Sequence, residues 1–328
     1  MKALRWGILS TGTIAKKFAQ TLDGMKGEAI FGAVASRDLS KAKAFAQEYG
    51  ALAYFGSYEE LVASDEIDAV YVATPNRFHF ENSMLCLQAG KHVLCEKPFT
   101  INAAEAHKLY ETASANNLMI MDGLWTMHLP IYHKIREIVN NGDVGTVKHI
   151  RAEFGFAPSG ARKDFKMDQS LGGGSLLDVG IYTVVFAAML LGTNPASIKA
   201  HLNISDYGTD DLANVMLTFP CGATASLTSA IGTKMPTEGV IFGSEGLIHV
   251  PVIISATKMA VHPLEGEPTE FEMPFDINGF EYQIREFAKC LGEGQLESRL
   301  LSKEFSLGVM QVLDKVREIC GFKYSFEA

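Results

Sequence analysis

Lys97 is a candidate for handling protons, because of the residues that surround it. It belongs to the run Cys95-Glu96-Lys97-Pro98, which directly follows an apolar stretch with the composition of a buried strand. Open α/β sheets present ligand-binding residues at the carboxyl ends of their strands, so this lysine stands where a bound ligand would react. Pro98 would help to fix the turn. The alternative is a lysine that is merely exposed, since Glu-Lys-Pro is common in proteins.

Tyr182 is a second candidate for proton transfer. It ends the run Leu171-Gly172-Gly173-Gly174-Ser175-Leu176-Leu177-Asp178-Val179-Gly180-Ile181-Tyr182, whose glycines predict a flexible or closely approached backbone. Asp178 precedes Tyr182 by four residues, and residues at this spacing share one face of an α-helix. A tyrosine has an ordinary pKa of about 10, and a neighbouring ammonium group would lower it toward neutral pH. The alternative is a core tyrosine bonded to the backbone.

A phosphate-binding loop is predicted near the start of the chain. The segment Gly7-Ile8-Leu9-Ser10-Thr11-Gly12-Thr13-Ile14-Ala15 lies between a strand pattern and a helix pattern. The dinucleotide fingerprint G-x-G-x-x-G/A fits Gly12 and Ala15, but Ser10 replaces its first glycine. The helix that follows would offer unsatisfied N–H groups to phosphate. We therefore expect a cofactor-binding loop of Ser10, Thr11, Gly12, Thr13 and Ile14, with a plain tight turn as the alternative.

The segment Ala35-Ser36-Arg37-Asp38 ends the second expected strand, where the type of cofactor is decided. An NAD enzyme normally has a carboxylate here for the ribose 2′-hydroxyl, whereas NADP needs a cation. Ser36 and Arg37 suit a 2′-phosphate, so NADP is expected and NAD is less favoured. Asp38 weakens this expectation, although it or Ser40 could cap the next helix. Arg37 could also be a solvated loop residue.

The first part of the chain, residues 1–122, predicts a doubly wound α/β domain. Its apolar runs lack alternation and are each followed by a helical pattern, as in a parallel sheet covered on both faces. The expected strands are 4–9, 29–35, 69–73, 92–95 and 118–121. The expected helices are 15–22, 40–49, 79–89 and 103–115.

The second part, residues 123–328, has a different pattern. One-sided alternation predicts strands at 147–154, 213–219, 223–230 and 246–250, which suits a mostly antiparallel sheet in an α+β domain. A helix is expected at about 175–190. Two more helices close the chain, the first with Phe280, Ile284, Phe287 and Leu291 on one face, the second with Leu307, Met310, Leu313 and Val316.

Together these features resemble the glucose–fructose oxidoreductase and inositol dehydrogenase family, whose members pair a Rossmann domain with an open-faced sheet domain and carry the E-K-P lysine. The resemblance spans nearly the whole chain and includes Thr74-Pro75-Asn76 through His79, Gly90-Lys91-His92-Val93 and the Gly172–Tyr182 run. Other details are closer to the dimeric dihydrodiol dehydrogenases and NADP-dependent xylose dehydrogenases. These are Arg5-Trp6-Gly7-Ile8 with Ser10, the 35–38 segment, Trp125-Thr126, and Tyr182 in place of a common histidine.

The resemblance implies a role for each candidate residue. Lys97 and Tyr182 would be the proton-handling pair, and Asp178 would orient Lys97 or a substrate hydroxyl. The cofactor would also meet Thr74, Pro75, Asn76, His79, Glu96 and Lys97. Trp125, Phe154 and Phe280 are candidates for the substrate pocket, with core packing as the alternative. The implied assembly is a homodimer through the open sheet of the second domain, with Met216 and Leu227 as candidates to face the partner.

Composition excludes several other classes of function. A net charge of −9 disfavours binding to nucleic acid, and no apolar run is long enough to span a membrane. The five cysteines form no C-x-x-C pair, so neither a disulfide framework nor a metal site is expected, and a cytoplasmic location fits.

The predicted activity is NADP-linked transfer of a hydride between nicotinamide and a CH–OH or C=O group of a sugar, polyol or vicinal diol. A silent NAD(P)-binding regulatory or sensor protein on the same fold is the main alternative, and redox-assisted glycoside cleavage or imine reduction is a third. The substrate itself cannot be read from the sequence, and the branch's arginine and aromatic residue after Trp125-Thr126 are replaced by Met127-His128.

Overall fold

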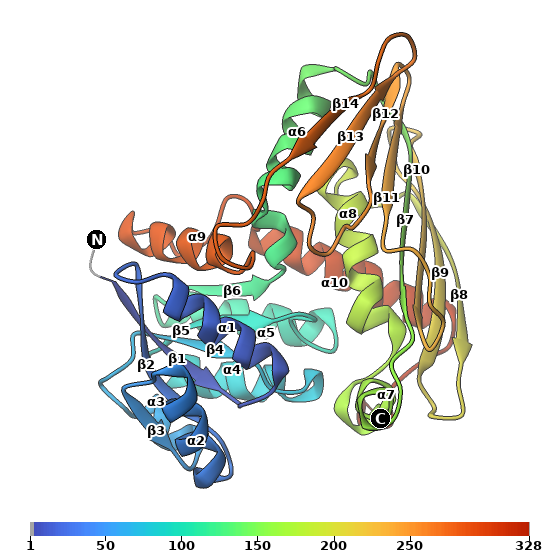
Figure 1. Cartoon of the computed structure of the whole chain (residues 1–328). Helices are drawn as coiled ribbons and strands as arrows, with labels where there is room; N and C mark the ends of the chain where they lie inside the picture. Colours follow the sequence, from blue (N-terminus) through green and yellow to red (C-terminus); the bar gives the residue numbers. More distant parts are fainter. Residues whose placement is uncertain (1–2, 328) are drawn as a thin grey trace. The chain divides into compact units, whose positions relative to one another are not determined.

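The computed structural model describes residues 3–327, which form two compact units (Figure 1). The first unit runs to Trp125 and also contains Phe275–Ser306, and the second contains Thr126–Pro274 and the residues from Leu307 onward. The chain therefore returns to the first unit. A single domain boundary at residue 122 would instead assign residues 275–306 to the second domain. The returning segment belongs to the first unit because Asn278 accepts a hydrogen bond from Thr21 at 3.0 Å and the Phe287 ring packs 5.1 Å from that of Trp6.

The first unit is built on a six-stranded, fully parallel sheet with the order β3-β2-β1-β4-β5-β6. Its strands are β1 Leu4–Leu9, β2 Ala29–Ala35, β3 Ala53–Phe55, β4 Ala69–Val72, β5 His92–Glu96 and β6 Ile120–Gly123. Its helices are α1 Thr13–Gly24, α2 Leu39–Tyr49, α3 Tyr58–Val62, α4 His79–Gln88, α5 Ala103–Ala115 and α9 Glu281–Gly292. The predicted doubly wound parallel domain is confirmed.

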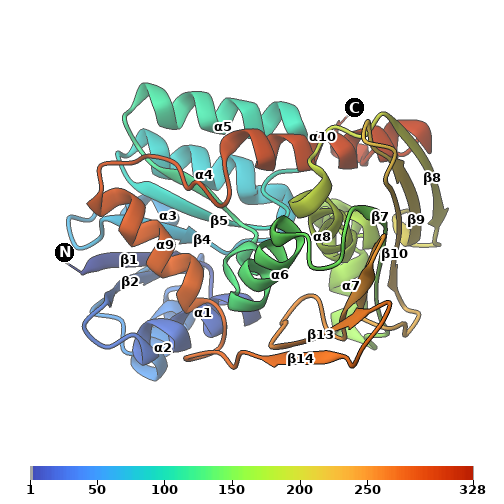
Figure 2. The ribbon, with the colours of Figure 1, turned by 90° about the horizontal axis from the view of Figure 1, so that it is seen from above.

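Both faces of this sheet are covered, which explains why its strands lack alternation. In Figure 2, α1, α2 and α9 lie on one side of the sheet and α4 and α5 on the other. All four residues of β4 are buried. The expected strand at 118–121 begins two residues late, at Ile120, because the N–H of Leu118 still bonds to Ala113 at the end of α5.

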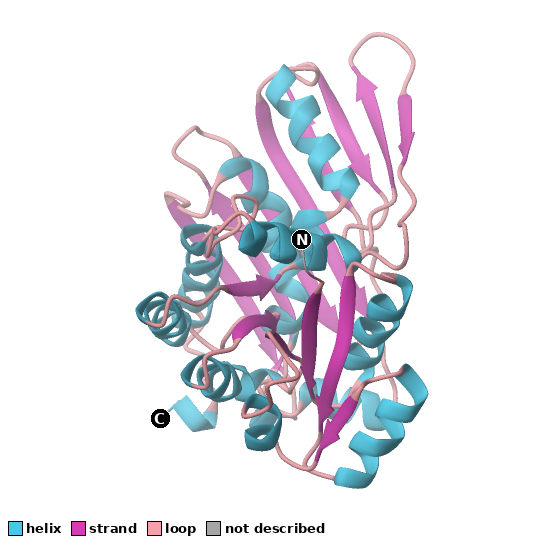
Figure 3. Cartoon of the chain, turned by 90° about the vertical axis from the view of Figure 1, so that its left-hand side faces the viewer, coloured by secondary structure: helices cyan, strands magenta, loops and turns pink. Residues whose placement is uncertain are grey.

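The second unit is built on an eight-stranded mixed sheet with the order β14-β13-β12-β11-β7-β10-β9-β8. The strands of the protein are drawn in magenta in Figure 3. Only the β7–β10 pair is parallel, so the expectation of a mostly antiparallel sheet is confirmed. The strands are β7 Val147–Phe156, β8 Ser197–Ile204, β9 Asp210–Thr218, β10 Thr224–Ile231, β11 Gly239–Gly243, β12 Gly246–Val250, β13 Lys258–Pro263 and β14 Thr269–Glu272. The other elements are α6 Pro130–Asn141, α7 Ala161–Met167, α8 Ile181–Leu191 and most of α10 Lys303–Ile319. No helix within residues 3–327 is long and apolar enough to cross a membrane.

One face of the eight-stranded sheet is covered by α8 and by the turn that precedes it. The expectation that Met216 and Leu227 both face a partner is wrong for Leu227, which is 2% exposed. Leu227 pairs with Val215 on the covered face, because successive side chains of a strand point to opposite faces. Met216, the next residue along β9, is 51% exposed on the other face.

The expected helix at 175–190 begins with a single π-helical turn, Leu176–Gly180, which continues into α8. The glycines before it are closely approached, as one of the two predicted alternatives had it. A side chain at Gly174, whose φ is +122°, would collide with the carboxyl group of Asp210. That carboxyl group accepts a 2.6 Å hydrogen bond from the Leu176 N–H, and the Tyr324 hydroxyl donates to the Gly173 carbonyl at 2.8 Å. β9 and the end of the chain thus hold the start of the helix.

This arrangement makes Gly174 intolerant of a side chain. We expect Gly174→Ala to lower the free energy of unfolding by about 3 kcal/mol, because a strained φ and a steric collision act together. Gly222→Ala is the matched control, since Gly222 also has a positive φ, +86°, but no atom lies within 4 Å of the added carbon. It should cost about 1 kcal/mol. Denaturant unfolding of both variants measures the difference, and equal losses would show that Asp210 does not restrict this position.

Candidate active site

The predicted phosphate loop joins β1 to α1 in the first unit. Ser10 has a φ of +96°, a backbone conformation that normally favours glycine, and its N–H bonds to Ala35 at 3.0 Å. The serine that departs from the fingerprint therefore still forms the glycine-type turn. Its hydroxyl accepts a 3.2 Å hydrogen bond from the N–H of Gly12, the residue that precedes α1.

The backbone at Gly12 is open on the side where a side chain would stand. A side-chain carbon added to Gly12 would meet nothing closer than the Ser10 hydroxyl oxygen at 3.5 Å, an ordinary contact. The fold alone thus does not require glycine here, whereas close approach of a ligand to the backbone would. No side chain caps α1, and its first turn carries no acidic residue. Thr11 and Ile14 are half-buried and Thr13 is exposed, so the loop can accept an anion at the helix N-terminus.

In the segment after β2, the Ser36 hydroxyl accepts a 3.3 Å hydrogen bond from the Asp38 N–H. Asp38 is the N-cap of α2 and accepts from the N–H groups of Ser40 at 2.9 Å and Lys41 at 3.3 Å. The expected capping role of Asp38 is confirmed, and the bond with the Ser40 side chain is the first of the interactions that lower its pKa. Arg37 is exposed and Ser36 half-buried.

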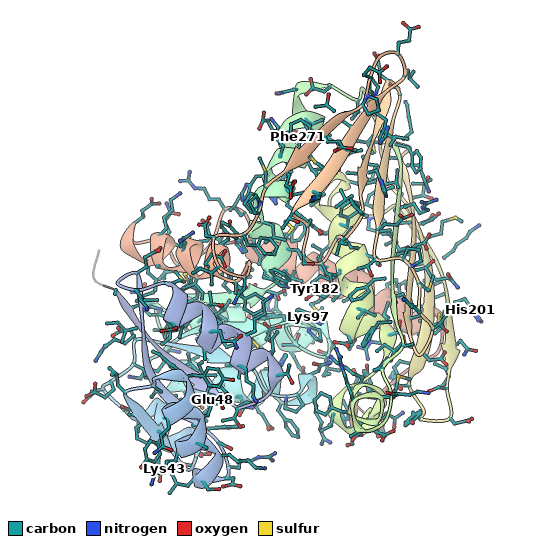
Figure 4. The ribbon with its side chains drawn as sticks, in the orientation of Figure 1. Lys43, Glu48, Lys97, Tyr182, His201 and Phe271 are labelled. Atoms are coloured by element: carbon teal, nitrogen blue, oxygen red, sulfur yellow. The ribbon has the colours of Figure 1, made fainter. Side chains whose placement is uncertain are left out.

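The Glu96-Lys97-Pro98 run lies at the carboxyl end of β5 as predicted, and Lys97 is half-buried (Figure 4). Glu96 is 4% exposed; its carboxylate accepts hydrogen bonds from the Tyr71 hydroxyl and, at 3.2 Å, from the Lys97 N–H. Burial raises the pKa of Glu96, and the Tyr71 bond and the Lys97 charge oppose that change. The buried Glu96 carboxylate therefore fixes the backbone of Lys97 through the bond with its N–H group.

His79 joins this run to the loop after β4. Its Nδ1 lies 2.7 Å from the Pro98 carbonyl and its Nε2 lies 2.8 Å from the Thr74 carbonyl. Burial lowers the pKa of His79, and the two carbonyl contacts raise it. Thr74 is further held by Asn82, which donates to its hydroxyl at 3.1 Å. Both ring nitrogens of His79 are thus used inside the first unit, while Pro75 and Asn76 remain half-buried at the start of the next turn.

Lys17 is a functional candidate that the sequence did not reveal. Its ammonium nitrogen lies 4.0 Å from the ring centre of Trp125 and 4.1 Å from that of Phe280. Burial lowers the pKa of Lys17 to about 8, and the charges of Glu96 and Glu281 oppose the change. Trp125 and Phe280, which were predicted to line the substrate pocket, therefore both contact the Lys17 ammonium group. No sequence pattern indicated Lys17. Its contact with Phe280 forms only because segment 275–306 packs in the first unit, far along the chain from Lys17.

In the second unit, Tyr182 is the second residue of α8 (Figure 4). Asp178 lies in the π-helical turn before α8. The four-residue spacing of an α-helix therefore does not describe this stretch, and π-helical turns are frequent at functional sites. Tyr182 is 7% exposed, and its ring centre lies 6.1 Å from that of Phe154.

Lys166 on α7 is a second residue that sequence patterns missed. Its ammonium nitrogen lies 2.8 Å from each carboxylate oxygen of Asp178, whose side chain is 7% exposed. This charge-assisted contact stabilises the carboxylate in a place where water is nearly absent. Twelve residues separate the pair, and no helical or strand spacing connects them. Within residues 3–327, no group of three or more His, Cys, Asp or Glu side chains could hold a metal ion.

Comparisons with known proteins agree with this geometry. Residues 4–124 match the model of the oxidoreductase family with an NAD-binding Rossmann fold, and residues 132–249 match the carboxy-terminal domain model of the same GFO/IDH/MocA family. The chain is 34% identical to mouse trans-1,2-dihydrobenzene-1,2-diol dehydrogenase over 332 residues, covering 98% of both proteins. The human protein of that name is 33% identical, also over 98% of each chain.

Two solved structures show the same fold at nearly full length. KijD10, a 3-ketoreductase from Actinomadura kijaniata in complex with NADP and TDP-benzene, has a TM-score of 0.87 at 28% identity and covers 97% of this chain and 98% of its own. Aldose-aldose oxidoreductase from Caulobacter crescentus, complexed with glycerol, has a TM-score of 0.88 at 25% identity with the same coverage. The resemblance expected from the sequence motifs is confirmed, and the chain belongs to the GFO/IDH/MocA family of NAD-binding oxidoreductases.

Proposed function

We propose that this chain is an NADP-dependent oxidoreductase that interconverts a CH–OH group and a C=O group on a sugar, polyol or vicinal diol. The observation that carries the proposal is the open phosphate loop, whose Gly12 has no neighbour that the fold must accommodate. Three of the relatives support the substrate class, since their names refer to a diol, an aldose and a ketone reduction. A cytoplasmic location agrees with five unpaired thiols among the described residues.

The proposed cofactor site runs along the carboxyl ends of β1, β2, β4 and β5. Ser10 to Ile14 would hold the pyrophosphate, Ser36 and Arg37 the ribose 2′-phosphate, and the loop from Thr74 to Asn76 the remainder. The bound nicotinamide would supply the acceptor or donor of a hydride. His79 and Glu96 would support the cofactor site without contacting the cofactor. Their polar atoms bond to groups in the core and fix the loops after β4 and β5.

Lys97 and Tyr182 are proposed to handle the proton of the reacting hydroxyl. Tyr182 is nearly buried beside Phe154, so its hydroxyl would work in a medium that strengthens electrostatic contacts. Lys166 pairs with Asp178 at 2.8 Å, and the Asp178 carboxyl group would accept a hydrogen bond from a substrate hydroxyl. The proton released on oxidation would pass to Tyr182 or Lys97, and in reduction it would return by the same groups.

Purified protein with NADP, offered a panel of sugars, polyols and vicinal diols, tests the activity through nicotinamide absorbance. Reduction of the cofactor with at least one member is expected. Tight binding of NADP without turnover on any member, in both reaction directions, would favour the regulatory alternative. That alternative needs the phosphate loop but has no use for the proton-handling pair.

The proton-handling pair predicts a specific pattern of losses. Lys97→Met and Tyr182→Phe should each lower turnover by about 10²–10⁴-fold, the usual contribution of general acid–base catalysis. Because the two groups would act as a unit, the double variant should be little worse than the poorer single one. Steady-state kinetics with saturating NADP measures this. Lys43→Met and Tyr207→Phe, both at exposed positions, are matched controls that should retain turnover. Near-normal turnover of both single variants would contradict the assignment.

The cofactor preference predicts a second pattern. We expect NADPH to bind at least about tenfold more tightly than NADH, because a hydrogen bond between charged groups contributes about 1.5–3 kcal/mol. Arg37→Ala should remove most of this margin by weakening NADPH alone. Ser36→Asp should favour NADH, because a carboxylate repels the phosphate and accepts hydrogen bonds from a free ribose.

Quenching of tryptophan fluorescence by each cofactor measures these affinities. Lys41→Ala is a matched control, since Lys41 is an exposed cation one turn into α2. It should leave the preference unchanged. Equal affinities of the unaltered protein for the two cofactors, or full discrimination in Arg37→Ala, would show that Arg37 is only a surface residue.

We also propose a homodimer through the uncovered face of the eight-stranded sheet. Met216 is 51% exposed at this face, so its side chain is accessible to a partner. Met216→Lys should shift sedimentation toward monomer, because the ammonium would lose its water on association. Leu264→Lys, at a position 76% exposed beyond the end of β13, is the control and should leave the dimer intact. A monomer at micromolar concentration in the unaltered protein would exclude this interface.

A further inference from the structure

The Lys17 ammonium group joins three parts of the first unit that lie far apart in the sequence. Lys17 is on α1, Trp125 lies two residues beyond the end of β6, and Phe280 directly precedes α9. The Lys17 Nζ lies 4.0 Å from the centre of the Trp125 ring and 4.1 Å from that of the Phe280 ring. The two rings also pack against each other, with their centres 5.0 Å apart in an edge-to-face arrangement. One cation therefore contacts two aromatic side chains that are themselves in contact.

The two rings hold the ammonium group in place. Within residues 3–327, its nitrogen has no hydrogen-bond acceptor and no ion-pair partner. The negative face of an aromatic ring attracts a cation, and the attraction becomes stronger where water is excluded. Trp125 is 6% exposed and Phe280 is 1% exposed, so little water reaches the rings. The positions of the rings therefore depend on the charge of Lys17.

The Trp125 ring is enclosed on another side by the returning segment. A side-chain carbon added to Gly279 would lie 2.5 Å from Cζ3 of Trp125, so the indole packs directly on the Gly279 backbone. Asn278 fastens this backbone to α1, because it accepts a hydrogen bond from the Thr21 hydroxyl at 3.0 Å and donates one to the Lys17 carbonyl at 3.4 Å. These contacts do not change with pH, whereas the charge of the ammonium group does.

Two buried carboxyl groups, Glu96 and Glu281, affect the charge of Lys17. Burial lowers the pKa of Lys17 to about 8, and the charges of the two carboxylates oppose this change. Both carboxylates are bonded elsewhere, Glu96 to the Tyr71 hydroxyl and Glu281 to three N–H groups of the loop before α9. Lys17 is therefore a cation at neutral pH, and it becomes a neutral amine as the pH rises through about 8.

We propose that Lys17 is a positioning residue of the active site, whose ammonium group fixes the Trp125 ring for contact with the substrate. Of the two aromatic partners, Trp125 keeps the larger exposed surface. It follows β6 at the carboxyl edge of the sheet, where open α/β sheets bind their ligands. The inference rests on the proposed function for the contact between Trp125 and a substrate. Its physical content, a ring held by a charge, exists without turnover.

Fluorescence of Trp125 measures this interaction in the whole protein. The chain has two tryptophans, and Trp6 is fully buried against Phe18 and Phe287. Subtracting the spectrum of the matching Trp125→Phe variant therefore isolates the emission of Trp125. This emission should change with a midpoint near pH 8, because the nearby charge is lost there. In Lys17→Met the emission should keep its alkaline form at every pH.

Two further variants separate the charge of Lys17 from its shape. Lys17→Arg keeps a cation that stays protonated up to about pH 12 and also stacks on aromatic rings, so Trp125 should keep its acidic form through pH 8. Lys16→Met, at the exposed preceding position on α1, is the matched control and should retain the midpoint of the unaltered protein. Circular dichroism verifies that each variant is folded.

Steady-state kinetics tests the consequence for the substrate. With saturating NADP and a sugar, polyol or diol that gives turnover, Lys17→Met should raise KM at pH 7 by about 5- to 30-fold, the contribution of a cation–π contact shielded from water. The value of kcat should stay nearly constant, because Lys97 and Tyr182 handle the proton and are unaltered. KM of the unaltered enzyme should rise above pH 8, and KM of Lys17→Arg should not.

A transition near pH 8 that persists in folded Lys17→Met would overturn the proposal. So would a Lys17→Arg spectrum that follows the unaltered protein through pH 8, or an equal KM in Lys17→Met and Lys16→Met. A protein that shows the transition but turns over no member of the panel would contradict the proposed function and confirm the interaction between Lys17 and Trp125. An active enzyme without the transition would do the reverse.

Discussion

The parallel strands of the first unit end at one edge of the sheet, and the polar groups buried there must be stabilised without water. Desolvation makes an unpaired charge costly, so each group requires a partner at close range. Glu96 is held by Tyr71 and by the Lys97 backbone, His79 by two carbonyl groups, and Asp122 by Ser306. The Glu96 and His79 contacts connect β4 and its following loop to the run after β5. They fix the backbone on which Lys97 stands.

In the second unit, the position of Asp178 depends on the backbone of the turn that carries it. The π-helical turn that carries Asp178 starts from a glycine with a positive φ, and the carboxyl group of Asp210 occupies the space that a side chain would need. Asp210 also satisfies the free Leu176 N–H, as a cap does at a helix start. Lys166 then balances the charge of Asp178. In both units, residues outside the predicted motifs contact the motif residues and hold their backbone.

Aromatic residues have a role in the first unit that differs from the expected pocket lining. Trp125 and Phe280 pack around the Lys17 ammonium, and cation–π contacts of this kind gain strength as water is excluded. Phe280 is 1% exposed, which leaves its ring almost no free surface. The contact also attaches the returning segment 275–306 to α1, together with the Thr21–Asn278 hydrogen bond. Phe154 keeps the position beside Tyr182 that a pocket residue would have.

Local patterns in the sequence were sufficient for the fold class of both units and for most elements of the first unit, whereas α6, α7, β8, β11, β13 and β14 of the second unit were not predicted. Buried strands without alternation, helical periodicity and the motif at each strand end depend on residues close together in the chain, so they can be read without the structure. The cap at Asp38 was anticipated for the same reason, whereas the glycine-type turn at Ser10 appeared only in the structure. The irregular π-helical turn was not anticipated, because an α-helical spacing was assumed for residues 175–190.

The tertiary structure alone decided which distant groups meet. The contacts of Lys166 with Asp178, of Asp210 with the glycine loop, and of Ser306 with Asp122 join residues 12 to 184 positions apart. No periodicity connects such residues, since their distance depends on how the sheets and helices pack. Which face of the sheet the Leu227 side chain points to was likewise decided by the strand register in the structure. A shift of one residue exchanges the two faces of a strand. The sequence by itself determined which motifs the chain carries. Packing decided which charged and polar side chains contact the motif residues, because the strength of an electrostatic contact depends on distance and burial.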